Sequence, residues 1–504
     1  IFILRIERRS EKAYRSLSTF SWYHFLMRVL FVASEATPIA KVGGLGDVVG
    51  ALPKVLTKVG VAASVVIPRY GFIRTTGMRR VADRVPVSIG AGREYVSLFE
   101  TKLSGSRVPI YLVENRTYLS TGPGPYFERS ALAGTKRELE RFTFFSKAVF
   151  ELLRTQHLKA DVLHANDWHT GFLVASIAHR RKEIPGKVRT VFTIHNLANQ
   201  GRWDLESLRR FVVPRGEEDV LTPYGKDANL MAEGILNADR VTTVSPTYAR
   251  EIMTEAYGEG LEGVLRTRRG DVSGILNGID YEFFDPASDS LIPYRYTGKN
   301  FVTGKSANKK YLQSKLGLSV DDSPLFGLVS RLTSQKGIDF ITEALPRSIE
   351  RNGGQFVFLG QGTKEYEAAL GRLARRFPDR VAVRFGFDER LAHVIYAGSD
   401  FFLMPSRFEP CGLGQMIAMR YGTIPIVRAT GGLADSVKKG VTGFVFKEAS
   451  ARALAKALKD AAHLYARKPR QLEAVRRRAL RANFDFTVSG VSYARLYRKL
   501  LGGQ

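Results

Sequence analysis

Cysteine and long apolar runs are scarce in this chain of 504 residues. The single cysteine, Cys411, excludes an internal disulfide and fits a reducing compartment. No uninterrupted apolar stretch approaches the ~18 residues that a membrane-spanning helix needs, because Arg28 interrupts even the run from 20 to 33. We therefore expect a cytoplasmic protein with no membrane partner.

Acidic residues are also in short supply, with 49 Asp and Glu against 76 Lys and Arg, a formal net charge of +27. Such a charge attracts phosphates, nucleic acid or anionic membranes without selecting among them. The basic residues are spread along the chain and are not interleaved with aromatic side chains as in a nucleic-acid groove. We expect solvated surface charge with a local anion site, and no specific nucleic-acid partner.

Length and composition suggest two large globular domains. Residues 1–26 read as an extension of uncertain origin, since Glu7 and Glu11 are unusual in a plastid transit peptide and Met27 stands directly before a strand pattern. From Arg28 onward, short apolar runs alternate with helical patterns. The expected strands are 29–33, 63–67, 110–113, 162–165, 190–194 and 241–244, then 325–329, 356–359, 381–385, 401–404 and 424–427.

This alternation predicts parallel strands with crossover helices. We infer an α/β fold of two doubly wound domains: a first domain at 27–272, a hinge at 273–281, a second domain at 282–485 and a terminal helical segment at 486–504. Ligands of such sheets bind at the carboxyl ends of the strands, so two facing domains would share a cleft.

The loop from Lys41 to Asp47 follows the first expected strand and carries Gly43, Gly44 and Gly46. Its glycines and the following helix start suit a phosphate, although a tight connection without ligand is the alternative. The spacing does not match a dinucleotide fingerprint. Residues 304–306 resemble the end of a P-loop, but the preceding glycine is misplaced and no strand leads into them, so we reject that interpretation.

Polar residues gather at the ends of two expected strands, namely His164, Asp167, His169 and His195. They are candidates for metal ligands, for hydrogen bonds to sugar hydroxyls or for holding loops. Their spacing matches no strong metal motif, so we favour sugar hydroxyls and expect no metal and no other cofactor.

Two segments of the second half suit a sugar diphosphate. Arg331 and Lys336 lie between an expected strand and a helix, where fixed cations stabilise the charge on a departing nucleotide. In the segment 405–414, Glu409 is a candidate acceptor for sugar or ribose hydroxyls, and the amides of 412–414 suit a phosphate. A glycine-rich turn that only starts a helix is the alternative. Cys411 reads as a small buried apolar residue and not a nucleophile.

Taken in order, these loops resemble those of bacterial glycogen synthases and plant starch synthases, which use ADP-glucose. The resemblance spans nearly all of 27–497 and is carried by residues 41–45, 167–169, 195–197, 244–248, 277–280, 331–337, 408–413 and 428–433. It implies the GT-B arrangement of two Rossmann-like domains, with the terminal helix returning to the first, and retaining transfer of glucose from an ADP-glucose donor to the non-reducing end of an α-glucan acceptor.

The resemblance also implies site residues. As catalytic residues it implies Lys41, His195, Arg331, Lys336 and Glu409. As substrate-binding residues it implies Gly43, Gly44, Asp47, Asp167, Asn196, Asn277, Cys411, Gly412, Leu413 and Gly414. Because the sequence identifies no covalent nucleophile, we favour front-face substitution, in which the leaving diphosphate helps deprotonate the acceptor, over a transient enzyme ester.

Several positions depart from the family's usual pattern: Phe387, Gly414, Asn199, Ala232 and the region 120–140. The departures leave donor preference and acceptor length open. The competing interpretations are a related retaining transferase that uses UDP-glucose or another sugar nucleotide, and a noncatalytic glucan- or nucleic-acid-binding protein of the same fold.

Overall fold

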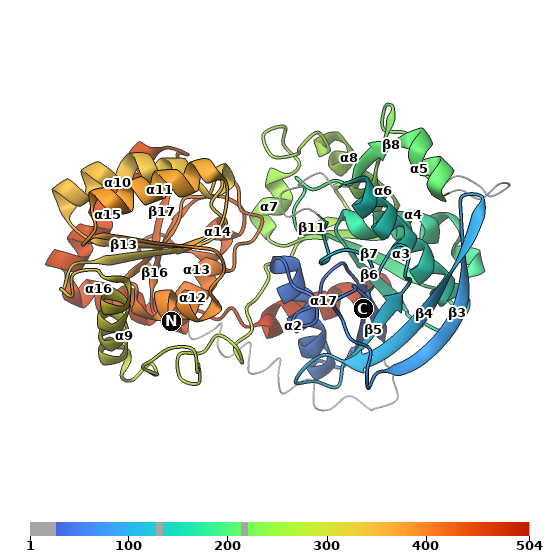
Figure 1. Cartoon of the computed structure of the whole chain (residues 1–504), viewed down its shortest axis with the longest axis horizontal. Helices are drawn as coiled ribbons and strands as arrows, with labels where there is room; N and C mark the ends of the chain where they lie inside the picture. The colour runs from blue at the N-terminus through green and yellow to red at the C-terminus, as the bar shows by residue number, and fades with distance from the viewer. Residues whose placement is uncertain (1–26, 128–134, 213–219, 503–504) are drawn as a thin grey trace.

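The computed structural model describes residues 27–127, 135–212 and 220–502, which form two α/β domains side by side (Figure 1). The inferred extension at 1–26 lies outside the described residues. Among the described residues, no helix is long and apolar enough to cross a membrane.

The first domain is built on a nine-stranded sheet with the order β11-β10-β7-β6-β1-β2-β5-β4-β3. Its parallel strands are β1 (Arg28–Val32), β2 (Ala62–Pro68), β5 (Pro109–Glu114), β6 (Val162–Asn166), β7 (Arg189–Ile194), β10 (Arg240–Thr243) and β11 (Val272–Gly274). The parallel strands expected from the sequence are therefore confirmed, apart from shifts at their ends.

Two antiparallel strands at one edge of this sheet, β3 (Arg79–Ile89) and β4 (Gly92–Lys102), were absent from the sequence prediction, which expected parallel strands only. Both strands mix buried and exposed residues. They consequently lack the continuous apolar run that marks a parallel strand covered on both faces. A small separate ladder of β8 (Arg202–Asp204) and β9 (Asp227–Asn229) was also absent from the sequence prediction, because strands of three residues are too short to show a pattern.

The central strand β1 shows how the core of the first domain is layered. Val29 and Phe31 belong to one apolar cluster, which includes α2 and α17, while Leu30 and Val32 belong to the cluster on the opposite face. Successive strand side chains point to opposite faces, so a strand buried on both must be apolar throughout. The helices of this domain are α2 (Gly44–Lys58), α3 (Lys136–Arg154), α4 (Gly171–His179), α5 (Leu205–Val212), α6 (Leu230–Asn237), α7 (Pro246–Glu251) and α8 (Glu262–Thr267).

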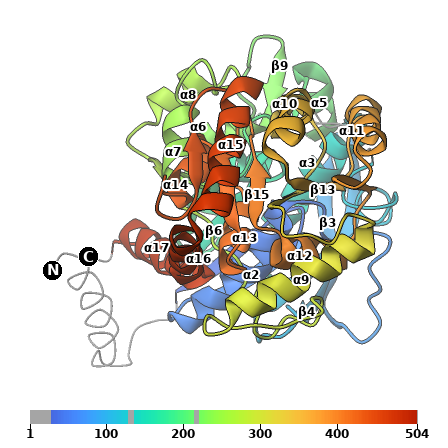
Figure 2. The same cartoon turned by 90° about the vertical axis from the view of Figure 1, so that its left-hand side faces the viewer.

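The second domain has a six-stranded parallel sheet of order β14-β13-β12-β15-β16-β17, with helices on both faces (Figure 2). Its strands are β12 (Leu325–Val329), β13 (Gln355–Gly360), β14 (Val381–Phe385), β15 (Phe401–Met404), β16 (Ile424–Arg428) and β17 (Phe444–Phe446). Its helices are α9 (Phe301–Leu316), α10 (Ile338–Asn352), α11 (Lys364–Arg376), α12 (Glu389–Gly398), α13 (Gly414–Arg420), α14 (Gly431–Ser436), α15 (Ala451–Arg467) and α16 (Pro469–Arg481).

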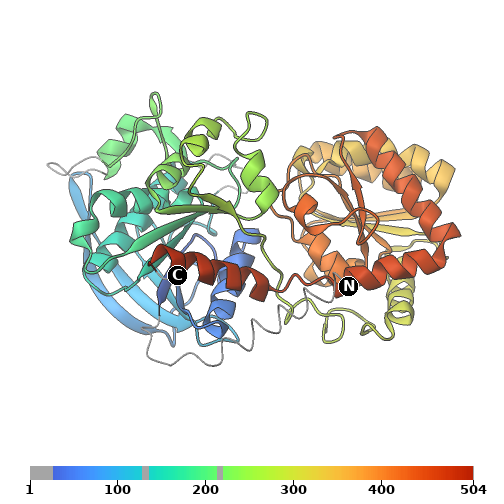
Figure 3. The ribbon, with the colours of Figure 1, turned by 180° about the vertical axis from the view of Figure 1, so that it is seen from behind.

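The last helix, α17 (Phe486–Leu500), crosses from the second domain and lies against the first (Figure 3). Tyr493 and Tyr497 are buried there in the same cluster as Val29 and Phe31 of β1. Beside this crossing, the amide of Ile279 donates to the carbonyl of Phe484 at 2.8 Å, so the two connections between the domains run next to each other. The domain limits given by the sequence remain a proposal.

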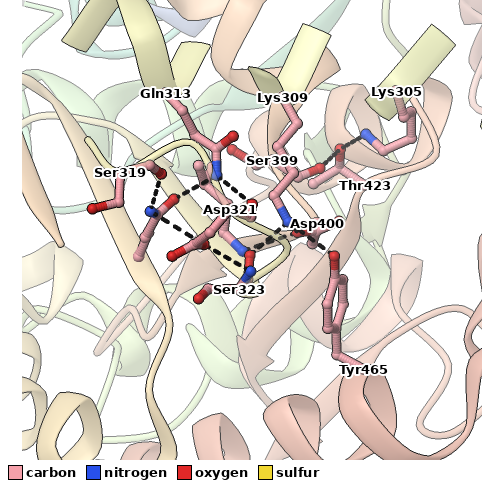
Figure 4. A network of polar contacts seen from close by, with 12 residues as sticks. Lys305, Lys309, Gln313, Ser319, Asp321, Ser323, Ser399, Asp400, Thr423 and Tyr465 are labelled. Carbon is pink, nitrogen blue, oxygen red and sulfur yellow. Dashed lines mark hydrogen bonds and ion pairs between the residues drawn. The ribbon is translucent and has the colours of Figure 1, made fainter. Parts of the chain in front are cut away.

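A buried polar network ties α9 to the sheet of the second domain (Figure 4). Lys309 lies 2.8 Å from Asp400, which also pairs with Arg476, and the amide of Leu325 donates to Asp400 at 2.9 Å. Lys305 donates to the carbonyls of two residues and to the hydroxyl of Thr423. The P-loop-like residues 304–306 thus lie inside α9, and no strand-to-helix loop exists there.

Candidate active site

A cavity of about 330 Å³ opens between the two domains and is lined by residues of both. It lies where the loops after β1, β12 and β15 meet, at the carboxyl ends of these strands, as doubly wound sheets favour. The lining includes these predicted site residues: Lys41, Gly43, Asp47, Arg331, Lys336, Glu409, Gly412, Leu413 and Gly414. The fold therefore brings the predicted cations of both domains to one space.

On the side of the first domain, Lys41 forms an ion pair with Asp47 at 2.7 Å. The carboxylate of Glu35, which is almost fully buried, accepts hydrogen bonds from the amides of Val42 (2.6 Å) and Gly43 (2.9 Å). Burial raises the pKa of Glu35, and these two amides oppose the shift. The sequence had suggested that the glycine loop offers free amides to a phosphate, but two of them already serve an internal anion.

On the side of the second domain, Lys336 donates to Glu409 at 2.6 Å, and the hydroxyl of Ser406 donates to the same carboxylate oxygen at 3.0 Å. Both members of the ion pair are largely shielded from solvent, with side chains 17% and 7% exposed. Arg331 is exposed and donates to Gln335 at 3.0 Å. Lys336 therefore holds a defined position, whereas Arg331 has room to meet a ligand.

The segment 405–414 turns sharply before α13 because Gly412 has a φ of 71°, a conformation that favours glycine. Gln415 fixes the turn by donating to the carbonyls of Cys411 and Gly412. Burial raises the pKa of Cys411 to about 12, and this residue does not line the cavity. A buried neutral thiol is a poor nucleophile, which agrees with the sequence interpretation.

The residues of the predicted polar cluster at the ends of β6 and β7 do not line the cavity. Asp167 adopts a φ of 57° and accepts from the amide of His195 at 2.7 Å, and burial raises its pKa to about 7. His195 contacts the amide oxygen of Asn166 at 2.9 Å, and burial lowers its pKa to about 3. Asn196 caps its own loop by accepting from the amide of Ala198. The cluster presents a neutral imidazole.

The side chains of His164 and His169 make contacts of their own, although burial and then the charge of nearby His195 lower the pKa of both to about 3. His164 bonds the hydroxyls of Tyr497 (2.6 Å) and Thr193 (2.5 Å), so it packs between the sheet and α17. His169 stacks on Trp168 with ring centroids 4.2 Å apart. Within the described ranges, no group of three His, Cys, Asp or Glu side chains is arranged to hold a metal ion.

Two further predicted residues lie at the edges of the site. Asn277 is buried, and its side-chain oxygen has no hydrogen-bond partner among the described residues. A Cβ on Gly44 would lie 4.0 Å from the side chain of Leu413, so the two domains approach each other there. Neither Asn277 nor Gly44 lines the cavity.

An aromatic wall of the cavity was missed by the sequence reasoning, apart from Phe387. Its members are Phe283, Phe284, Phe387, His393 and Tyr396. His393 is buried, contacts the carboxylate of Asp289 at 2.8 Å and stacks on Phe284 with centroids 5.0 Å apart. Phe283 and Phe284 lie in a turn-rich stretch without periodicity, so no sequence pattern marked them; Glu35, by contrast, directly follows the first strand and could have been noticed.

Comparisons with known proteins agree with this geometry. A starch synthase catalytic domain matches residues 28–267, and a group 1 glycosyl transferase domain matches residues 312–478. The glycogen synthase of Geotalea daltonii is 42% identical over 94% of this chain and 99% of its own length, and that of Lacticaseibacillus casei is 42% identical over 95% and 100%. The catalytic domain of starch synthase IV from Arabidopsis thaliana, bound to ADP and acarbose, superposes with a TM-score of 0.84 at 32% identity, covering 95% of this chain and 100% of that one.

Proposed function

This chain belongs to the glycogen and starch synthase family and is a GT-B glycosyltransferase, and we propose that it transfers glucose from ADP-glucose to the non-reducing end of an α-1,4-glucan with retention at the anomeric carbon. The observation that carries the proposal is the cavity between the domains, whose lining includes Lys41, Lys336 and Arg331. Three cations at one cavity suit a diphosphate leaving group.

The proposed roles follow from the contacts. Lys336 and Arg331 stabilise the charge on the departing diphosphate from the second domain, and Lys41 approaches from the first. Lys336 and Ser406 both donate to the same carboxylate oxygen of Glu409, so the carboxylate can still accept hydrogen bonds from hydroxyls of the donor glucose. The aromatic wall with the exposed Phe387 suits the base, since aromatic rings stack on nucleobases.

The contacts also favour front-face substitution. Three acidic residues line the cavity, namely Asp47, Glu389 and Glu409. Asp47 and Glu409 are each ion-paired to a lysine, which makes either a weak nucleophile, and Glu389 is exposed at the start of α12. Asp167 does not line the cavity, and its carboxylate accepts a hydrogen bond from the amide of His195. In the proposed step the bond between the anomeric carbon of the donor glucose and the diphosphate breaks, an oxygen of the departing diphosphate takes the proton of the acceptor hydroxyl, and the new glycosidic bond forms on the same face. His195, a neutral imidazole, suits a hydrogen bond to a glucose hydroxyl.

The decisive experiment measures chain growth on glycogen with radiolabelled ADP-glucose or UDP-glucose in separate reactions. We expect faster initial incorporation from ADP-glucose, and an exo-acting α-1,4-glucanase should release the new label from the non-reducing ends. Adding a chelator to the ADP-glucose reaction should leave the rate of incorporation unchanged, because fixed cations already face the diphosphate. Equal rates with the two donors would contradict the assignment of ADP-glucose as the donor. Activity that is lost in chelator and restored by a metal ion would contradict the expectation that no metal is needed.

A further inference from the structure

We propose that Glu35 is a positioning residue of the transfer reaction, which fixes the loop that carries Lys41; this inference rests on the proposed function of Lys41. Glu35 follows β1 and is 3% exposed. One oxygen of its carboxylate accepts two consecutive amides, Val42 at 2.6 Å and Gly43 at 2.9 Å, immediately after Lys41.

Besides these two bonds, the restraints on the loop include the paired backbone hydrogen bonds between Ala36 and Ala40 and the ion pair of Lys41 with Asp47. Val42 is 59% exposed, a Cβ on Gly43 would meet nothing within 4 Å, and Gly43 provides no side-chain cap to α2. Packing therefore does not determine the direction of Lys41. Because one carboxylate oxygen accepts from two consecutive amides, it fixes the orientation of both peptide groups next to Lys41.

Glu35 is itself held in place from the other side. Its second oxygen accepts from the hydroxyl of Tyr126 at 2.9 Å, and that hydroxyl also lies 3.1 Å from the hydroxyl of Ser34. A Cβ on Gly46 would come within 3.1 Å of the carboxylate, so α2 closes over it. The carboxylate has no room to turn toward the cavity, and Glu35 does not line it. Its effect must act through the loop.

The loop amides and the side chain of Lys41 have separate roles at this end of the site. The amides of Val42 and Gly43 are engaged by Glu35, which leaves the ammonium of Lys41 as the group that meets an incoming diphosphate. An internal anion in a backbone cradle fixes the loop before the donor arrives, and such preorganisation lowers the ordering cost of binding.

The experiment compares the wild type with Glu35→Ala, Lys41→Ala and the double variant, assayed with ADP-glucose and glycogen. If Glu35 acts through Lys41, Glu35→Ala should lower kcat/KM for the donor by about 10-fold or more, as loss of about 1.4 kcal/mol or more of restraint implies. The double variant should then be no slower than Lys41→Ala, because coupled residues are non-additive. Glu35→Gln keeps an oxygen acceptor and should stay within about threefold of the wild type.

Multiplicative losses in the double variant would overturn the proposal, since Glu35 would then act independently of Lys41. If kcat/KM for the donor falls as much in Glu35→Gln as in Lys41→Ala, the proposal is also overturned, because the charge of Glu35 and not the loop geometry would then matter. This comparison can be made even if the Glu35→Ala protein does not fold. Inactivity of the wild type would overturn the proposed function instead. Calorimetric binding of ADP to the same proteins then tests the coupling without any transfer reaction.

Discussion

At the scale of single residues, Lys336 offers the most direct test of catalysis. Its ion pair with the buried Glu409 means that an alanine would leave a carboxylate poorly compensated, and breaking a buried pair costs about 3–5 kcal/mol. We therefore choose Lys336→Gln, which keeps a hydrogen-bond donor and removes the charge. Turnover should fall on the order of 10²-fold, as for other charge-stabilising donors, while the melting temperature should fall less than in Lys336→Ala because the hydrogen bond to Glu409 is kept.

A matched control for this variant is Lys364→Gln, at the exposed start of α11 in the same domain. It should leave both turnover and melting temperature near the wild-type values, since exposed substitutions usually change stability by about 0.5 kcal/mol or less. A folded Lys336→Gln enzyme with the turnover of the control would remove Lys336 from the catalytic residues.

At the scale of elements, Lys309 of α9 pairs with Asp400 at the start of β15 (Figure 4). The amide of Leu325 at the start of β12 and the side chain of Arg476 in α16 complete this network around Asp400. It lies at the strand ends opposite the cavity, where a role in stability is expected. Replacing Asp400 by alanine leaves two buried cations without their anion and should lower the free energy of unfolding by about 3–5 kcal/mol. Urea unfolding measures this.

The control for the network is the exposed pair of Glu350 and Arg376, whose side chains are 51% and 58% accessible. Glu350→Ala should cost no more than about 1 kcal/mol. If Asp400→Ala unfolds at the same urea concentration as this control, the network does not stabilise the domain.

The elements also show what the sequence could and could not reveal. Strands 325–329 and 401–404 were predicted at their observed limits, because parallel strands that are buried on both faces have continuous apolar sequences. The edge strands β3 and β4 and the wall residues Phe283 and Phe284 carry no such pattern, since long-range packing alone decides them. His164 was grouped with the site because strand ends can be found from sequence, whereas the face to which a side chain points cannot.

At the scale of the whole molecule, the proposed catalysis requires the two domains to meet. In the contact between α7 and α14, each domain contributes one carboxylate that accepts hydrogen bonds from the other domain. Glu251 of the first domain accepts from the amide of Gly431 and the hydroxyl of Thr430 at the start of α14. Asp435 of the second domain accepts from the amide of Thr247 at the start of α7, at 2.7 Å. Helix starts carry free amides and partial positive charge, so each domain supplies an anion that the other's helix needs.

We expect this contact to hold the domains at the separation that lets Lys41 and Lys336 face one cavity. Replacing Glu251 and Asp435 together by alanine should lower kcat/KM for the donor by about 10-fold or more, because each charged hydrogen bond contributes about 1.5–3 kcal/mol. Small-angle X-ray scattering should show a larger radius of gyration for this variant. The control is Asp460→Ala, an exposed acidic residue of α15, which should match the wild type in both measurements. If the double variant scatters and reacts like that control, the contact does not set the spacing of the domains, and the two connections beside α17 must do so alone.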